Sequence, residues 1–106
     1  MTTNPRLDIP QIAARALEQA PHVLGHWLPE GKRQGVEWLA RNPTRADDRP
    51  GSFSVNTATG QWSDFATGDK GGDLVGLVAY LEGARQLDAA RALADFMGIT
   101  DQDTTA

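Results

Sequence analysis

The sequence contains no cysteine, only two histidines and no long run of apolar residues. Without cysteine the chain has neither disulfide bonds nor a thiolate metal site. The longest apolar stretch, residues 74–81, is interrupted by Gly76 and is too short to cross a bilayer. Residues 1–10 are polar and lack the apolar core of a signal peptide. These absences lead us to expect a cytoplasmic protein with no membrane partner.

The 106 residues predict one domain with a modest hydrophobic core. Its net charge of −4 is uneven, because residues 1–50 carry seven basic and six acidic groups and residues 51–106 carry three and eight. An acidic balance argues against strong non-specific attraction of nucleic acid by the chain as a whole. Acidic residues are also interleaved with the basic ones, which is typical of a solvated, charge-mixed surface. Half of the ten basic residues nevertheless fall within eighteen positions, at Lys32, Arg33, Arg41, Arg45 and Arg49.

Hydrophobic periodicity predicts two helices at each end of the chain. The first helix begins after Asp8, which can cap it, and stops or kinks at Pro21; a second, short helix covers about residues 22–28. Asp73 is a good N-cap for a helix over residues 74–82, which Gly83 ends. Gly98 ends a last helix over residues 87–97. Residues 1–7 and 100–106 are expected to be flexible tails.

Three short segments between the helices are typical of strands, namely residues 36–40, 52–55 and 61–65. A turn over residues 32–35, a loop over 42–51 and a hairpin turn over 57–60 separate them. Such short strands need a third partner and helical packing to be stable. We therefore expect an α+β fold with a small three-stranded antiparallel sheet, flanked by the N-terminal and C-terminal helices.

No set of residues assembles a catalytic centre in the sequence. His22 and His26 have the spacing of metal ligands on a helix, but no third ligand lies within sequence reach. Asp64, Asp69 and Asp73 could gather around a divalent cation. Each of the three also has a local explanation, as a strand end, a loop residue and a helix cap. We therefore expect no metal, no cofactor and no catalysis by this chain itself.

Residues 60–73 hold four glycines, three of them between a predicted strand and a predicted helix. Backbone N–H groups at a helix N-terminus attract anions, so the loop over residues 68–73 is a candidate phosphate cradle. It lacks the spacing of a Walker A loop or a dinucleotide fingerprint, and Asp69 and Asp73 would repel phosphate. A tight structural turn that presents Lys70 outward is the better interpretation.

Aromatic and basic residues gather on and around the predicted sheet. Single-stranded nucleic acid is typically held by aromatic faces that stack on bases and by cations that follow the backbone. For Phe53 and Phe65 we favour a place in the core. For Trp38 and Trp62, stacking on bases and packing in the core both remain open. The candidate phosphate contacts are Arg41, Arg45, Arg49 and Lys70.

Three stretches match the pattern of a known family: Pro-Gly-Ser-Phe-Ser-Val at residues 50–55, Thr-Gly-Gln-Trp-Ser-Asp-Phe at 59–65 and Gly-Gly-Asp-Leu-Val at 71–75. Together they resemble the zinc-binding domain at the N-terminus of bacterial and phage DNA primases. The pattern of that family is Cys-Pro-x-His, then Thr-Pro-Ser-Phe-x-Val, then Cys-Phe-x-Cys-Gly, then Gly-Gly-Asp opening an apolar helix. The resemblance covers a core motif over about residues 36–82.

The zinc ligands of this family are replaced here. The Cys-Pro-x-His positions carry Asn42, Pro43 and Arg45, and the Cys-x-x-Cys positions carry Asp64 and Thr67. A structural zinc site needs four good nitrogen or sulfur ligands, so zinc should not bind. The chain thus resembles a zincless relative, as in primase-helicase proteins of phages, plasmids and mobile elements. We expect hydrogen bonds to replace the metal, with Asp64 paired to Arg45 or to Asn42.

The resemblance implies a template-reading module that binds single-stranded DNA in replication, with the catalytic carboxylates in another domain. Its partners would be single-stranded DNA and a replicative helicase or a primase/polymerase protein of a primosome. Trp38 and Trp62 would stack on bases, and the four candidate cations would contact phosphates. The alternative is a protein-interaction module that has lost DNA binding and docks a replication polymerase or helicase. A stand-alone enzyme is a third, disfavoured interpretation, because no catalytic group has a partner.

Overall fold

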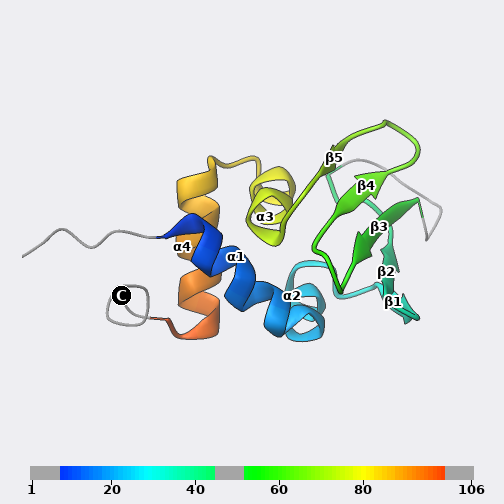
Figure 1. Cartoon of the computed structure of the whole chain (residues 1–106). Helices are drawn as coiled ribbons and strands as arrows, with labels where there is room; N and C mark the ends of the chain where they lie inside the picture. Colours follow the sequence, from blue (N-terminus) through cyan, green and yellow to red (C-terminus); the bar gives the residue numbers. More distant parts are fainter. Residues whose placement is uncertain (1–7, 45–51, 100–106) are drawn as a thin grey trace, which may run out of the picture.

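The computed structural model describes residues 8–44 and 52–99, which form four helices packed beside one sheet (Figure 1). The helices gather at one end and the sheet at the other. The elements in chain order are α1 (Ile9–Glu18), α2 (Ala20–Trp27), β1 (Lys32–Gln34), β2 (Glu37–Ala40), β3 (Phe53–Asn56), β4 (Trp62–Asp64), β5 (Lys70–Gly71), α3 (Leu74–Glu82) and α4 (Gln86–Met97). The predicted α+β class with an antiparallel sheet is confirmed.

The helix ends follow the predicted capping residues. The Asp8 carboxylate accepts a hydrogen bond from the Gln11 N–H at 3.1 Å, and the Asp73 carboxylate accepts one from the Gly76 N–H at 2.7 Å. Gly83 and Gly98 end α3 and α4 with φ of 62° and 73°, in the left-handed region that glycine adopts without a steric penalty. These four helix boundaries are therefore fixed by local chemistry.

The sheet has five strands among the described residues, so the prediction of three was wrong. All neighbours are antiparallel, in the order β1-β2-β3-β4-β5. The segment expected as a turn over residues 32–35 instead forms β1, which pairs Arg33 with Trp38 of β2. Residues 70–71 form β5, which pairs Gly71 with Trp62 of β4. Both additions are edge strands that a hydrophobic pattern does not mark, because β1 is exposed at every residue and β5 has only two.

The register of the sheet separates an inner face from an outer face. Directly paired residues point to the same side, so Trp38, Val55 and Trp62 share one face. That face is buried against the helices, with Phe53 and Val55 fully inaccessible to solvent. The opposite, outer face carries mainly polar side chains, including those of Lys32, Glu37, Leu39, Ser54, Asn56, Ser63 and Lys70.

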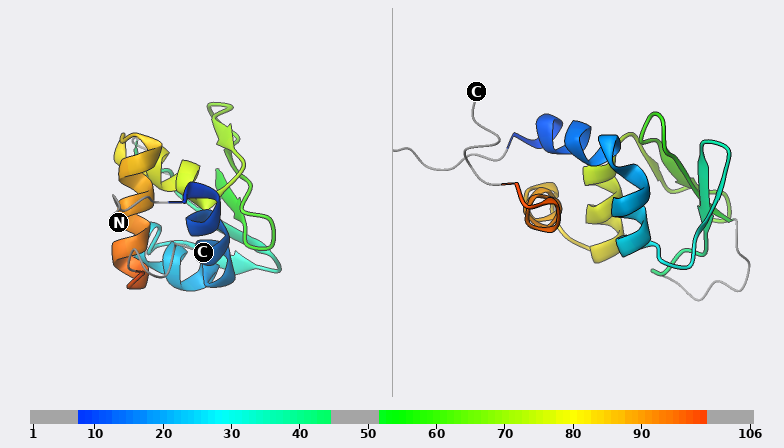
Figure 2. Two further views of the ribbon diagram at one scale, coloured as in Figure 1. Left: turned by 60° about the vertical axis from the view of Figure 1, so that its left-hand side comes forward. Right: turned by 90° about the horizontal axis from the view of Figure 1, so that it is seen from below.

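Helix α3 connects the inner face of the sheet to the rest of the helical layer. Its Tyr80 ring packs against Phe53 and Trp62, with ring centroids 6.0 and 4.9 Å apart. Leu74 and Leu77 of the same helix are buried in the core. Helix α4 lies on the side of α1 and α3 away from the sheet (Figure 2). The outer face of the sheet is therefore the one that no helix covers. No helix within residues 8–44 and 52–99 has the length and apolar character needed to span a membrane.

Candidate nucleic-acid interface

A buried hydrogen-bond network lies at Asn42 and Asp64, two of the positions that the resemblance matches to zinc ligands. Asn42 and Asp64 are 1% and 0% exposed, and the Asn42 Nδ2 group donates to Asp64 Oδ2 at 2.7 Å. The same amide donates to the Tyr80 hydroxyl at 2.9 Å, which in turn donates to Asp69 Oδ2 at 2.7 Å. The predicted pairing of Asp64 with Asn42 is therefore present. Its alternative partner, Arg45, lies outside the described residues.

The two buried side chains also shape the loops that carry them. Asn42 Oδ1 accepts hydrogen bonds from the N–H and the hydroxyl of Thr44, at 2.8 and 2.6 Å. Asp64 Oδ1 accepts from the Ala66 N–H at 2.8 Å. The loop after β4 closes further through Thr67, whose hydroxyl accepts from the Asp69 N–H at 3.2 Å. Hydrogen bonds thus connect the loop after β2 to the loop after β4.

These residues do not fit a structural zinc ion. The Asn42 amide nitrogen donates its protons to Asp64, so it offers no lone pair to a metal. Thr67 supplies only a hydroxyl, which is not a usual zinc ligand. The described residues contain no group of three His, Cys, Asp or Glu side chains placed to hold a metal ion. Asp69 and Asp73, considered above for a cation, are used by Tyr80 and by the N-terminus of α3.

His22 and His26 pack against another aromatic residue. Both imidazole rings stack on Phe96 of α4, with centroids 4.7 and 4.5 Å from its ring. Trp27 meets the edge of Phe96 at 5.3 Å and donates its indole N–H to Glu82 Oε2 at 2.7 Å. The histidine pair therefore helps to join α2 to α4.

The tryptophans of the sheet lie on its inner face. Trp62 is 6% exposed, and its indole N–H donates to the Asp73 carbonyl at 3.0 Å. Trp38 is half-buried and donates its indole N–H to the Leu28 carbonyl at 3.2 Å. Trp62 is therefore a core residue here, and a base could reach the face of its ring only if β5 and α3 moved away. Of the two alternatives for Trp62, stacking on bases and packing in the core, the structure shows packing in the core.

Phe65 is the aromatic residue that the sequence interpretation misplaced. We expected it in the core with Phe53, but Phe53 is 0% exposed and Phe65 is 75% exposed. The strand alternation contains the signal, because Trp62 and Asp64 point inward and Phe65 therefore shares the outward side with Ser63. Phe65 is a free aromatic surface on the uncovered side of the sheet.

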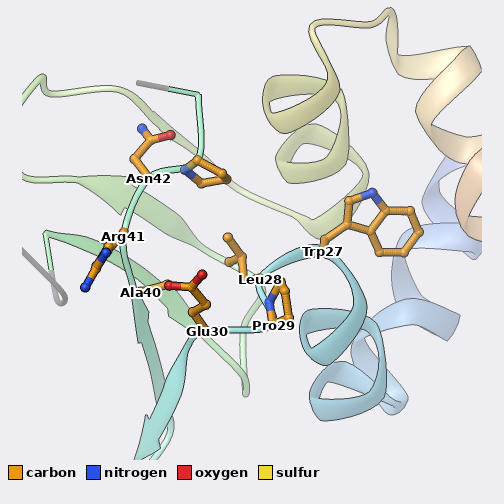
Figure 3. Close-up of a pocket in the computed structure, with 8 residues that line it drawn as sticks. Trp27, Leu28, Pro29, Glu30, Ala40, Arg41 and Asn42 are labelled. Carbon is orange, nitrogen blue, oxygen red and sulfur yellow. The ribbon is translucent and has the colours of Figure 1, made fainter. Parts of the chain in front are cut away.

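Two of the four predicted phosphate contacts are described, and both are exposed. Lys70 of β5 pairs with Ser63, which places it on the outer face. Arg41 follows the last residue of β2 and extends away from Trp27 (Figure 3). Arg45 and Arg49 lie outside the described residues. The structure thus brings Lys70 close to Phe65, since both side chains line one hollow of the outer face.

A shallow hollow of about 350 Å³ opens on the outer face of the sheet. It is called the sheet hollow below, and it is within the range of about 300–1,000 Å³ that is typical of ligand sites. Its lining is mostly polar, with one aromatic side and one cation: Glu37, Ser54, Asn56, Gln61, Trp62, Ser63, Phe65, Lys70 and Gly71.

A second hollow of about 260 Å³ lies between the end of α2 and the end of β2 (Figure 3). It is mostly apolar, with one carboxylate and one guanidinium among its lining residues. They are Trp27, Leu28, Pro29, Glu30, Ala40, Arg41, Asn42 and Pro43.

Comparison with solved structures finds this fold in a bacterial primase. The chain is similar to a primase of Aquifex aeolicus, in a structure that holds its zinc-binding and RNA polymerase domains, with a TM-score of 0.69 and 23% sequence identity. The superposition covers 95% of this chain and 24% of that chain, so this chain spans about a quarter of the primase structure. No family model and no curated protein matches the sequence. The shared feature is therefore a primase-like α+β fold.

Proposed function

We propose that this chain is a non-catalytic module that binds single-stranded DNA in a primase or primase-helicase system of a phage or mobile element. The observation that carries the proposal is the uncovered outer face of the sheet, where exposed Phe65 and Lys70 line the same hollow. The primase-like fold supports it. Catalysis would lie in another domain or in a partner such as a replicative helicase or polymerase.

The proposed strand runs across the outer face between the cations at its edges. Lys32 of edge strand β1 and Lys70 of edge strand β5 both point outward, and Arg41 is exposed at the end of β2. Phe65 offers a ring on which one base can stack, and such a contact contributes about 1–3 kcal/mol. The cations would pair with the phosphates on either side of the stacked base.

The test is fluorescence anisotropy with a labelled single-stranded oligonucleotide at low salt. We expect Phe65→Ala to weaken binding about tenfold, because one stacked base is lost. The matched control is Leu87→Ala, which removes another exposed apolar side chain, 41% accessible, from the start of α4. Wild-type protein that fails to bind any single strand at low salt would reject the proposed function.

An alternative function is a protein-interaction module that docks a replication polymerase or helicase. The mostly apolar hollow between α2 and β2 favours it, because apolar pockets with a few charged groups are common at binding sites. A replication protein should then co-purify from nuclease-treated extract. Pro43→Asp, which places a charge in that hollow, should abolish the co-purification, whereas Phe65→Ala on the outer face of the sheet should leave it unchanged.

A further inference from the structure

The lining of the sheet hollow places a hydrogen-bond acceptor beside a hydrogen-bond donor. Glu37 of β2 and Asn56 of β3 are directly paired in the register, and both line the hollow. One oxygen of the Glu37 carboxylate accepts a hydrogen bond from the Ser54 hydroxyl. Within the described part of the chain, its other oxygen has no hydrogen-bond partner. A carboxylate has about four lone-pair sites, so Glu37 can accept further N–H groups.

The side-chain amide of Asn56 supplies the donor, because its oxygen already accepts hydrogen bonds within the protein. Its Oδ1 accepts from the N–H groups of Ala58 and Thr59 at 2.8 and 3.1 Å, which fixes the hairpin turn between β3 and β4. Among residues 8–44 and 52–99, no acceptor takes the two N–H groups of the Asn56 amide, so both can donate to a ligand. The hollow therefore presents an N–H donor next to an acceptor-only carboxylate, at the side of an exposed aromatic ring.

The Watson–Crick edge of guanine is the best chemical complement to this arrangement. It carries a carbonyl oxygen followed by two adjacent N–H donors, the ring N1–H and the 2-amino group. The other three bases offer a single donor group on that edge. In thymine the donor lies between two carbonyls, whose oxygens repel a carboxylate. Free Watson–Crick edges are read in this way when single strands are recognised.

We propose that the sheet hollow binds a guanine base, with Glu37 as the residue that determines specificity. Glu37 accepts from N1–H and the 2-amino group, Asn56 donates to the guanine O6, and Phe65 stacks on the base. Lys70, at the rim, pairs with the adjacent phosphate. This inference rests on the proposed function, since it takes the guanine to be carried by a single DNA strand. A free guanine nucleotide offers the same hydrogen-bonding groups. The experiment distinguishes this ligand from a guanine within a DNA strand.

The experiment compares an oligo-dT strand with the same strand carrying one central guanine, by fluorescence anisotropy. We expect the guanine strand to bind about tenfold more tightly, which is the discrimination typical of one well-placed bidentate contact. Replacing that guanine by inosine, which lacks only the 2-amino group, should remove most of the gain. Competition with free GMP against IMP tests the same recognition in a nucleotide. A different result is displacement of the labelled strand by GMP but not by IMP, while a guanine in the strand gives no gain in affinity. That result would identify the hollow as a site for a free guanine nucleotide.

The key variant is Glu37→Gln. The readout is the affinity for the guanine-containing strand divided by the affinity for oligo-dT. Removing a negative charge raises the affinity for every strand, so Glu30→Gln, in the other hollow, serves as the charge-matched control. We expect the ratio to fall towards one in Glu37→Gln and to stay about tenfold in Glu30→Gln. Asn56→Asp retains an oxygen for the hairpin turn and replaces the donor, so it should also lower the ratio.

The outcomes separate this inference from the function on which it rests. Salt-dependent binding of oligo-dT with no gain from guanine, in strand or nucleotide, would overturn the guanine site and leave the DNA-binding function standing. An unchanged ratio in Glu37→Gln would also overturn it. Absence of binding to every strand at low salt would instead reject the function itself.

Discussion

At the scale of single residues, Asn42 and Asp64 do by hydrogen bonding what a metal ion does by coordination. A structural zinc ion holds two loops together through strong bonds to both. Here the Asn42 amide links its own loop to Asp64 and to Tyr80, while each side chain also accepts N–H groups of its own loop. The pairing of Asn42 with Asp64 could be predicted, because residues at the ligand positions of one metal must be adjacent. The part played by Tyr80 could not, since it depends on how α3 packs against the loops.

The contribution of this network can be measured by removing its buried carboxylate. Asp64→Ala takes away the acceptor of the Asn42 amide and of the Ala66 N–H, so we expect a loss of about 3 kcal/mol in the free energy of unfolding. Urea denaturation gives the value. Asp69→Ala is the control, because within the described residues that exposed carboxylate accepts one hydrogen bond, from the Tyr80 hydroxyl, and its loss should cost about 1 kcal/mol or less. Equal stability of Asp64→Ala and wild type would show that the network is not what holds the loops.

At the scale of elements, the sheet shows where sequence patterns succeed and where they fail. The inner positions of β2, β3 and β4 alternate with outer ones that are polar except for Leu39, and the sequence predicts each of these strands to within a residue or two of its ends. The edge strands carry no such signal: β1 reads Lys-Arg-Gln, and β5 is defined only by its backbone pairing with β4. The same alternation, applied one residue further, would have placed Phe65 outside. Amphipathic periodicity therefore predicts the buried side of a sheet better than its width.

Gly71, the last residue of β5, and Gly72, which follows it, provide a test of how this edge is built. A Cβ atom on Gly71 would lie 2.4 Å from the Trp62 ring, whereas one on Gly72 would meet nothing within 4 Å. We expect Gly71→Ala to destabilise the protein by about 1–3 kcal/mol through overpacking. Gly72→Ala should be neutral or stabilising by up to about 1 kcal/mol, because it restricts the unfolded chain. Thermal unfolding of the two variants distinguishes them, and similar melting temperatures would contradict the packing of Trp62 on Gly71.

At the scale of the whole molecule, the position of the charges matters more for DNA binding than the net charge. The net charge is −4, and most carboxylates of residues 51–106 are held in place by a hydrogen bond or an ion pair within the protein, which fixes where their negative charge lies. Those of α4 lie behind α1 and α3 as seen from the sheet (Figure 2). A helix is about 10 Å across, which is comparable to the Debye length at physiological salt, so these charges are largely screened at the outer face. Within the described residues, five carboxylates of the 51–106 segment accept a hydrogen bond or form an ion pair: Asp64, Asp69, Asp73, Glu82 and Asp88.

The salt dependence of DNA binding reports how many phosphates this arrangement contacts. Each contact to a single strand contributes about −0.7 to the slope of log K against log salt, so the four predicted cations give a slope of about −3. Lys70→Ala should reduce the magnitude of that slope by about 0.7. Arg91→Ala removes an equal charge from an exposed position on α4 and should change neither the slope nor the affinity, because α4 lies away from the outer face. Equal slope changes in the two variants would mean that the strand follows the charge of the whole molecule rather than the outer face of the sheet.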